Sequence, residues 1–254
     1  MSASTTDILA EAERLLEPER FDDYGPNGLQ VPGPAQVSVL ASGVSAHAQL
    51  FELAAAAGAQ LLIVHHGLFW GSGTQVIDPI LKRRLQILFE ADIALAAYHL
   101  PLDAHPEIGN NALIARALGA DELQRFAEHR GEPIGILATL PGDGLAPGEL
   151  CAAVADIVGR EPLRFDAGAD PVRTLAVVSG AGSDYIEQAA RAGAQAFITG
   201  EPAERVMAQA RELGVHFIAA GHYATETFGV KKLGDHLAER FGVQHVFLDA
   251  PNPI

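Results

Sequence analysis

Apolar and polar residues alternate along the chain in a way that predicts strands and helices in turn. Short, mainly apolar runs at residues 37–41, 61–64, 174–178 and 196–199 are typical of buried strands. The first and third runs are followed by about a dozen residues with apolar side chains at helical spacing, and each such segment ends at a glycine. Strands alternating with helices predict an α/β fold with parallel strands.

The chain also repeats part of itself. Residues 37–60 align without a gap with residues 172–195, at a shift of 135, and residues 93–119 align with residues 216–242, at a shift of 123. Many matched residues are alanines in an alanine-rich chain, so chance identity is the alternative explanation. The constant register, with both copies leading into an apolar run, favours duplication, and we expect two related α/β halves.

Two adjacent histidines, His65 and His66, follow the apolar run 61–64. In open α/β sheets, ligands bind beyond the carboxyl ends of strands, where we expect these side chains. Adjacent strand residues point to opposite faces, so both serve one site only if the chain bends there, as Gly67 permits, or if each binds a different metal ion. The structural alternative is that one histidine caps a helix or forms a hydrogen bond in the core.

The segment that begins at His99 carries further candidates. We expect a stiff loop, because two prolines within it disfavour a regular helix. Asp103 is a potential oxygen ligand, and His99 or His105 is a potential ligand or proton carrier. Alternatively, Asp103 caps the helix predicted over residues 110–118.

A third group, His222 and Glu226, follows the apolar run 217–220. Their four-residue spacing places both side chains on one face of a helix, where they can bind one metal ion, although such spacing is common on solvated helices. The alignment at a shift of 123 places them on His99 and Asp103. The repeated pattern of histidine and acid strengthens the metal interpretation.

Together, five side chains follow strands at what we expect to be one edge of the sheet: His65, His66, Asp103, His222 and Glu226. Imidazole and carboxylate ligands suit Zn²⁺, Mn²⁺, Fe²⁺ or Ni²⁺. Five protein ligands are more than a single catalytic zinc ion needs, so we expect two divalent ions about 3.5–4 Å apart, bridged by a carboxylate.

Composition narrows the range of functions. A formal net charge of −15 over 254 residues, with only three lysines, argues against binding to duplex nucleic acid or to an anionic membrane. The single cysteine, Cys151, excludes an intrachain disulfide and favours a cytoplasmic protein, and we expect neither a signal peptide nor a membrane span. We expect the glycine-rich segment 179–182 to be a turn, with a small phosphate-binding loop as the alternative.

Six short motifs occur together: YGPNGLQ (24–30), VHHGLFW (64–70), YHLPLDAHP (98–106), GNN (109–111), GAGSD (180–184) and GHYATE (221–226). With them the sequence resembles, nearly from end to end, the Ngg-interacting-factor-three (Nif3-like) family, the GTP cyclohydrolase 1 type 2-like proteins. The histidine pair with the late H-x-x-x-E pattern is specific to this family. One departure is the loop Gly25-Pro26-Asn27, where relatives commonly carry other residues, and substrate preference differs if this loop shapes the pocket.

The resemblance implies a dinuclear metal centre formed by the five residues above, with Glu226 as the bridging carboxylate. It also implies two intertwined, structurally repeated α/β halves with mixed, mostly parallel sheets. We place the first half at residues 1–125, completed by 220–254, and the second at 126–219. A ring-shaped homohexamer is the implied assembly.

The expected function is that of a metal-dependent hydrolase that acts on a nucleotide or a related small molecule through a hydroxide bridging two metal ions. His105 or His99 would then carry the proton. The alternatives are a non-enzymatic metal-trafficking or regulatory protein-binding factor, and a scaffold whose histidines are structural. The charge of −15 fits a two-metal centre better than it fits an anionic triphosphate substrate such as GTP.

Overall fold

The computed structural model describes residues 2–71 and 76–254, which form two compact units. One unit consists of Met1–Leu102 and Gly229–Ala250, and the other of Asp103–Phe228 and Pro251–Ile254. The chain therefore passes from the first unit to the second, returns, and ends in the second. These units are defined by contacts between residues, whereas the predicted halves are defined by the sequence repeat. The boundaries of those halves stay a prediction.

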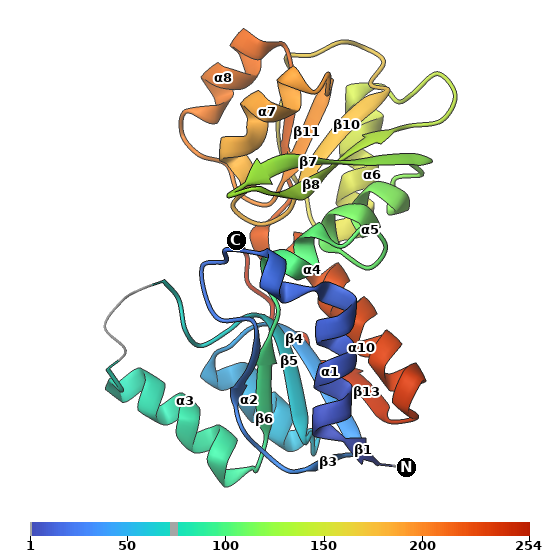
Figure 1. Ribbon diagram of the computed structural model, residues 1–254. Helices are drawn as coiled ribbons and strands as arrows, with labels where there is room; N and C mark the ends of the chain where they lie inside the picture. The colour runs from blue at the N-terminus through green and yellow to red at the C-terminus, as the bar shows by residue number, and fades with distance from the viewer. Residues whose placement is uncertain (1, 72–75) are drawn as a thin grey trace. The chain divides into compact units, whose positions relative to one another are not determined.

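The first unit is built on a five-stranded sheet with the strand order β13-β4-β5-β6-β2. Neighbouring strands from β13 to β6 are parallel, and β2 runs antiparallel to β6. In Figure 1, α1 and α10 lie on one side of this sheet, and α2 and α3 lie on the other. The elements are β1 (Ala3–Ser4), α1 (Thr5–Leu16), η1 (Pro18–Arg20), β2 (Gly28–Val31), β3 (Gln36–Val37), β4 (Val39–Ser45), α2 (Ala48–Ala56), β5 (Leu61–His66), α3 (Pro79–Glu90), β6 (Ala94–Ala97), β13 (Gln244–Phe247) and nearly all of α10 (Thr227–Phe241).

The second unit is built on a six-stranded sheet with the order β7-β8-β10-β11-β12-β9. Its three central neighbours, β10, β11 and β12, are parallel, and the outer strands pair antiparallel. The elements are α5 (Asn110–Ala117), β7 (Glu122–His129), β8 (Glu132–Thr139), α6 (Pro147–Val158), β9 (Leu163–Phe165), β10 (Thr174–Val178), η2 (Gly182–Tyr185), α7 (Ile186–Arg191), β11 (Ala196–Thr199), α8 (Val206–Leu213), β12 (His216–Ala219) and α9 (His222–Thr225). A short helix, α4 (Leu100–Ala104), crosses the boundary between the units.

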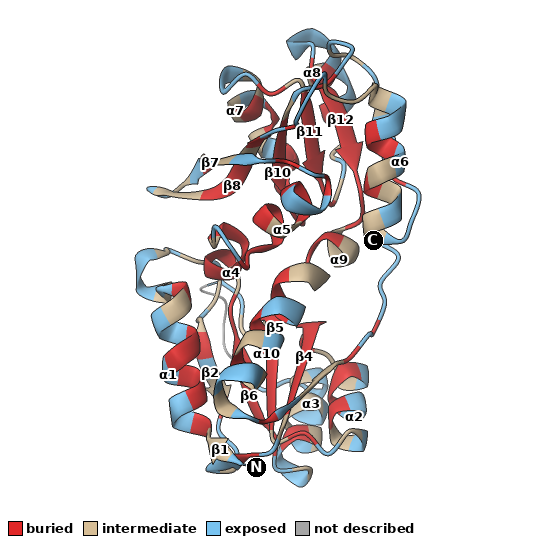
Figure 2. Ribbon diagram, turned by 90° about the vertical axis from the view of Figure 1, so that its right-hand side faces the viewer, coloured by how far each residue is buried: buried red, intermediate tan, exposed pale blue. Residues whose placement is uncertain are grey.

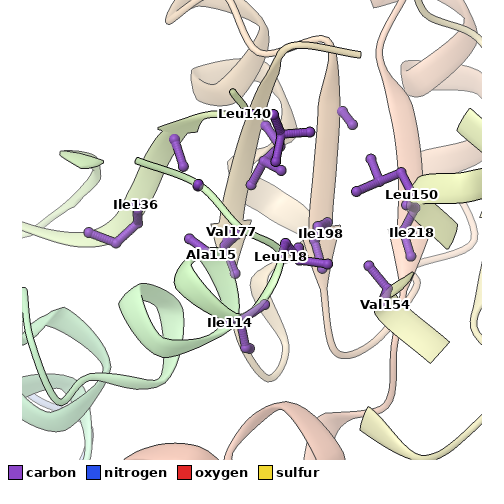
Figure 3. Close-up of a cluster of buried hydrophobic side chains, with 14 of the residues drawn as sticks. Ile114, Ala115, Leu118, Ile136, Leu140, Leu150, Val154, Val177, Ile198 and Ile218 are labelled. Atoms are coloured by element: carbon purple, nitrogen blue, oxygen red, sulfur yellow. The ribbon is translucent and has the colours of Figure 1, made fainter. Parts of the chain in front are cut away.

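Each unit has its own hydrophobic core, in which apolar strands are covered by the apolar faces of helices. Figure 2 shows the central strands of both sheets as buried. In the first unit, Leu50 and Phe51 of α2 pack with Leu62 of β5. In the second, Ile114 of α5 and Val154 of α6 pack against the β10–β12 strands (Figure 3). Burying each such side chain contributes about 1.5–3 kcal/mol, so the apolar pattern of the sequence stabilises both cores. The elements and the strand order confirm the predicted α/β class with mixed sheets.

The first duplicated segment folds into the same strand–helix–strand structure twice, with the same register. Leu40 pairs with Leu61 between β4 and β5, and the residues 135 positions later, Leu175 and Ala196, pair between β10 and β11. In both copies, the glutamine before the second strand accepts two hydrogen bonds from the backbone near the start of the first strand; the two glutamines are Gln60 and Gln195. This shared detail supports duplication over chance identity.

The second duplicated segment is offset by one residue in its strands. The backbone NH of Tyr98 bonds to Val64, and that of Ala220 bonds to Thr199. Since Val64 and Thr199 are equivalent in the first alignment, Tyr98 corresponds to Ala220, a shift of 122 and not the predicted 123. The extra residue is Gly221, which adopts a φ of 98° and restores the shift of 123 at the histidine that follows.

The segment after His99 differs from the expected stiff loop, because residues Leu100–Ala104 form the short helix α4. Proline is tolerated in the first turn of a helix, where its missing NH has no partner to lose, and Pro101 occupies such a position. In residues 2–71 and 76–254, no helix combines the length and the apolar character needed to cross a bilayer.

Candidate metal centre

Three histidines of the first unit come together where parallel strands end. His65 and His66 are the last residues of β5, and His99 follows β6. One ligand nitrogen from each ring lies within 4.8 Å of the others. The ring centroid of His65 lies 4.8 Å from those of both His66 and His99. Ligand nitrogens of the two adjacent histidines approach each other although β5 extends through both residues, so the bend that Gly67 would permit is not needed.

Hydrogen bonds fix the orientation of all three rings through the same atom, Nδ1. His65 Nδ1 lies 3.0 Å from the carbonyl oxygen of Tyr98, and His66 Nδ1 lies 2.9 Å from Ser45 Oγ. His99 Nδ1 lies 2.7 Å from Asp23 Oδ1. With Nδ1 engaged in each ring, Nε2 is the ring nitrogen that remains for a metal ion or for proton exchange.

Asp23 holds the ring of His99, a contact that the sequence did not reveal. Its second oxygen, Oδ2, accepts hydrogen bonds of 2.9 Å from the backbone NH of Leu100 and from the side-chain amide of Asn27. Burial raises the pKa of this carboxyl, but hydrogen bonding and the charge of His99 outweigh it and hold the pKa below its ordinary value. Asn27, in the loop Gly25-Pro26-Asn27, accepts from the backbone NH of His99 at 2.8 Å. This loop therefore positions His99.

In the second unit, His222 lies between two carboxylates. Its Nε2 is 3.0 Å from Glu226 Oε1, and its Nδ1 is 2.5 Å from Glu201 Oε1. Glu226 is only 2% exposed. Burial alone would lower the pKa of His222, but the hydrogen bonds and charges of Glu226 and Glu201 raise it to about 9. A divalent cation on Nε2 would replace the proton that lies between this nitrogen and Glu226.

Glycines make room for this pair of side chains. Gly180 has a φ of 61°, and a Cβ at that position would lie 2.2 Å from Glu226 Oε1 and 3.1 Å from His222 Nε2. A Cβ on Gly200 would lie 2.7 Å from the Cα of His222. The backbone therefore approaches the site more closely than any larger residue permits.

Asp103 lies in the second unit and is buried. Its Oδ1 accepts hydrogen bonds from the side-chain amide of Asn110, at 2.8 Å, and from Ser179 Oγ, at 2.9 Å. The N-cap of α5 is Gly109, so the alternative role of Asp103 as a helix cap is wrong. Two donors on one oxygen fix the orientation of the carboxylate.

His105, the other predicted proton carrier, has its Nδ1 engaged by the backbone. This atom accepts from the NH groups of Glu107 and Ile108, each at 3.1 Å, and so holds the turn before α5. This arrangement gives His105 a structural task.

The glycine-rich segment 179–182 bends between β10 and η2. The NH of Ser179 donates to Asn111, that of Gly180 to Thr225, and that of Gly182 to Thr199. A phosphate-binding loop needs its amides for the anion, so these three hydrogen bonds argue against that alternative.

A serine, a histidine and an aspartate of the first unit are arranged at the distances of a catalytic triad. Ser42 Oγ is 2.8 Å from His245 Nε2, and His245 Nδ1 is 2.7 Å from Asp235 Oδ1. However, Ser42 is completely buried in β4, and Gly234 packs directly against the His245 ring. No substrate reaches this serine, so the three side chains serve to hold β4, β13 and α10 together.

Two exposed aromatic rings flank His99. Trp70 is 45% exposed, with its ring centroid 5.0 Å from that of His99, and Tyr24 is 44% exposed, at 5.9 Å. The indole NH of Trp70 donates to the Gly67 carbonyl oxygen at 3.1 Å. Gln30 accepts from the NH of Leu68 and donates to Pro26, which ties the two aromatic loops together. Both rings are thus exposed, and a hydrogen bond holds the Trp70 indole in place.

The donor set of each unit fits a divalent transition metal. The first unit offers three imidazoles, and the second offers an imidazole with the carboxylates of Asp103 and Glu226. The cradle that Gly180 leaves beside Glu226 and the hydrogen bonds that orient every donor are features of ligand sites. The predicted ligands are thus divided between the two units, and sequence reasoning missed Asp23 and Glu201.

Comparison with known proteins agrees with this description of the fold. A protein of Pseudomonas aeruginosa named "GTP cyclohydrolase 1 type 2 homolog" is 44% identical over 253 residues, with 100% of both chains covered. One of the same name from Escherichia coli K12 is 43% identical, with 96% of this chain and 98% of that one covered. A solved structure from Thermus thermophilus is 38% identical with a TM-score of 0.90, covering 99% of this chain and 100% of that one. A family model also matches residues 3–253, and the chain belongs to the Duf34/NIF3 (NGG1p interacting factor 3) family.

Proposed function

We propose that the protein binds two divalent metal ions and uses them to hydrolyse a nucleotide or a related small molecule. The proposed ligands are His65, His66, Asp103, His222 and Glu226. The observation that carries the proposal is the buried Glu226 carboxylate, held beside His222 Nε2 in a space that only glycine at position 180 leaves open. Burying a carboxylate against an imidazole is costly unless a positive charge, from a proton or a metal ion, compensates.

The ligands differ in how they would hold the ions. The histidines of β5 present imidazole nitrogen, and Asp103 and Glu226 present oxygen, a mixed set that suits Zn²⁺, Mn²⁺, Fe²⁺ or Ni²⁺. Glu226 is the proposed bridging ligand. When bound, the ions would lower the pKa of a water molecule and polarise the substrate.

His99 is the proposed proton carrier. Asp23 holds its Nδ1, which leaves Nε2 for exchanging a proton with the substrate or with water. The same use of a carboxylate to orient a histidine occurs in other general acid–base sites. His105 is the alternative carrier, and its Nδ1 accepts from two backbone NH groups.

A planar, conjugated ring is the proposed recognition element of the substrate. Trp70 and Tyr24 offer exposed aromatic surface beside His99, and a heterocycle can stack on such surface at little entropic cost because the rings are already fixed. The relatives' names mention GTP cyclohydrolase, and the purine of GTP is such a ring. The net charge of −15 and the engaged amides of the 179–182 turn favour a ligand with few phosphates over a triphosphate.

Hydrolysis of a substrate panel tests the enzymatic part of this proposal. Purified protein loaded with Zn²⁺ or Mn²⁺ is incubated with purine nucleosides, nucleoside mono- and triphosphates and simple esters, and the products are separated by chromatography. We expect turnover of a heterocycle-containing substrate that stops when the metal is chelated and returns when it is restored. Metal binding without turnover on the whole panel would instead favour a metal-trafficking or regulatory role.

The ring-shaped homohexamer implied by the resemblance is also proposed for this chain. Light scattering after size exclusion tests it, with an expected mass of six times the chain mass of 26.7 kDa.

A further inference from the structure

Glu201 lies outside the predicted ligand set, yet its carboxylate contacts one member of that set directly. We propose that Glu201 is a positioning residue, which accepts a hydrogen bond from Nδ1 of His222 and so directs Nε2 towards the metal ion. The inference rests on the proposed metal-binding function, and it assigns a role to a residue that neither the motifs nor the ligand count identify.

Glu201 and His222 are joined by a direct hydrogen bond. Oε1 of Glu201 lies 2.5 Å from Nδ1 of His222, and a carboxylate acceptor makes such a bond stronger than a neutral one. On the other side of the ring, Nε2 faces Glu226. Because Oε1 of Glu201 holds Nδ1, a metal ion bound by this imidazole is bound through Nε2, next to the buried carboxylate.

The backbone that carries Glu201 is fixed on the strand side of the site. The NH groups of Gly200 and Glu201 both donate to the carbonyl oxygen of Gly180 at 2.9 Å, and Ser183 Oγ donates to the carbonyl oxygen of Glu201. The NH of Gly221, next to His222, donates to the carbonyl oxygen of Gly200, also at 2.9 Å. Donor and acceptor of the Glu201–His222 bond are therefore held on neighbouring, hydrogen-bonded segments.

Exposure separates the two carboxylates that flank His222. The side chain of Glu226 is 3% exposed, whereas that of Glu201 is 38% exposed and lines a cavity of about 370 Å³ together with Arg160 and Leu163. A buried carboxylate on Nε2 is suited to bind a cation, whereas a half-buried one on Nδ1 is suited to orient the ring. Outer carboxylates of this kind fix the tautomer and raise the basicity of a ligating histidine.

Three variants separate this role from a structural one. Glu201→Ala removes the acceptor, Glu201→Gln keeps an acceptor but removes the charge, and Glu212→Gln makes the same charge change on an exposed part of α8. Zn²⁺ affinity is measured for each full-length protein by competition with a chromophoric chelator at constant pH. The ¹⁵N NMR signals of His222 in the Zn²⁺-loaded protein report which ring nitrogen binds the metal, and urea unfolding of the metal-free proteins reports stability.

We expect Glu201→Ala to weaken Zn²⁺ binding by about 10–100-fold, the range found when outer-sphere partners of a metal ligand are removed. Glu201→Gln should lose only a few-fold, with His222 still bound through Nε2, and Glu212→Gln should match the wild type. If Glu201→Ala does not fold, Zn²⁺ affinity is compared between Glu201→Gln and Glu212→Gln. A larger loss in Glu201→Gln supports the positioning role.

Wild-type Zn²⁺ affinity and an unchanged His222 spectrum in Glu201→Ala would overturn the inference while leaving the proposed metal function intact. Absence of Zn²⁺ binding by the wild-type protein would overturn both. An equal loss of affinity in Glu201→Gln and Glu212→Gln would assign the effect to overall charge and would also contradict the positioning role.

Discussion

Asp23 and His99 share a hydrogen bond of 2.7 Å between Oδ1 and Nδ1, although 76 positions separate them in the sequence. The same carboxylate binds the backbone NH of Leu100, so one side chain fixes both the ring of His99 and the start of α4. Glu201 stands in the same relation to Nδ1 of His222 in the other unit. In both units an acidic residue outside the motifs orients a histidine within them.

Asp23→Asn is expected to destabilise the first unit. The amide keeps the size of the side chain, but it replaces one acceptor oxygen with a donor that faces the Leu100 NH or the Asn27 amide. Leaving a buried donor without its acceptor costs about 1–3 kcal/mol, and we expect a loss of that size in the free energy of urea unfolding of the metal-free protein. Glu19→Gln, an exposed change in η1, is the control. Equal stability of the two variants would show that Asp23 does not hold this loop.

Gly180→Ala is expected to abolish metal binding without unfolding the protein. The new Cβ would collide with Glu226 and crowd His222, in addition to the strain of a positive φ, which costs about 1–2 kcal/mol. Gly193→Ala is a matched control, because Gly193 also has a positive φ, of 87°, but nothing lies within 4 Å of the added Cβ. Both variants should lose similar backbone stability in urea, and only Gly180→Ala should lose Zn²⁺. Wild-type Zn²⁺ affinity in Gly180→Ala would place the metal elsewhere.

Glu11 is expected to make the stability of the first unit depend on pH in the acid range. Hydrogen bonds from Arg14 and then from His236 outweigh burial and lower the pKa of Glu11 from 4.5 to about 2. A carboxyl with a lowered pKa in the folded state stabilises the protein above the pKa of the unfolded state, and this contribution disappears as the pH falls from about 4.5 towards 2.

The measurement is urea unfolding of the wild type and Glu11→Gln from pH 2 to pH 7. The difference in unfolding free energy should be about 1 kcal/mol above pH 5, since Arg14 is exposed, and should vanish near pH 2. Glu90→Gln, at the exposed end of α3, should show no such difference. A difference in unfolding free energy between the wild type and Glu11→Gln that persists at pH 2 would contradict this explanation.

Binding of a planar heterocycle is expected to quench the fluorescence of Trp70, the only tryptophan of the chain. The Zn²⁺-loaded protein is excited at the red edge of indole absorption and titrated with guanosine, with ribose 5-phosphate as the ligand that lacks a ring to stack. Replacing Trp70 with leucine should weaken guanosine binding, measured by calorimetry, by about 10-fold, the equivalent of roughly 1.4 kcal/mol of stacking. Phe89→Leu, an exposed aromatic change on α3, is the control. Equal quenching by guanosine and ribose 5-phosphate would argue against stacking.

The sequence predicted elements whose signal is local. The apolar run 61–64 gave β5, and the constant shift of 135 anticipated that β4–β5 and β10–β11 share one register. Predicted ligands such as His65 and Glu226 stood out because histidine and acid recur at fixed spacing after strands. The expected loop after His99 was wrong because proline within the first turn is compatible with a short helix such as α4.

The orienting residues could not be predicted in the same way. Glu201 reaches His222 across 21 positions, and Asp23 reaches His99 across 76, through contacts that exist only in the folded chain. Neither residue has a periodicity or spacing that distinguishes it from the other acidic residues. The one-residue offset at Gly221 was likewise invisible, because alanine matches alanine in either register.

The central claim is that the protein binds two divalent ions through the histidines and carboxylates of its motifs. Metal analysis by plasma mass spectrometry, after Zn²⁺ loading and removal of excess metal, tests it most directly in the wild type and in the His65→Ala and His222→Ala variants. The account predicts two ions per chain in the wild type and loss of metal in either variant. Fewer than one ion per chain in the wild type, or wild-type metal content in both variants, would contradict it.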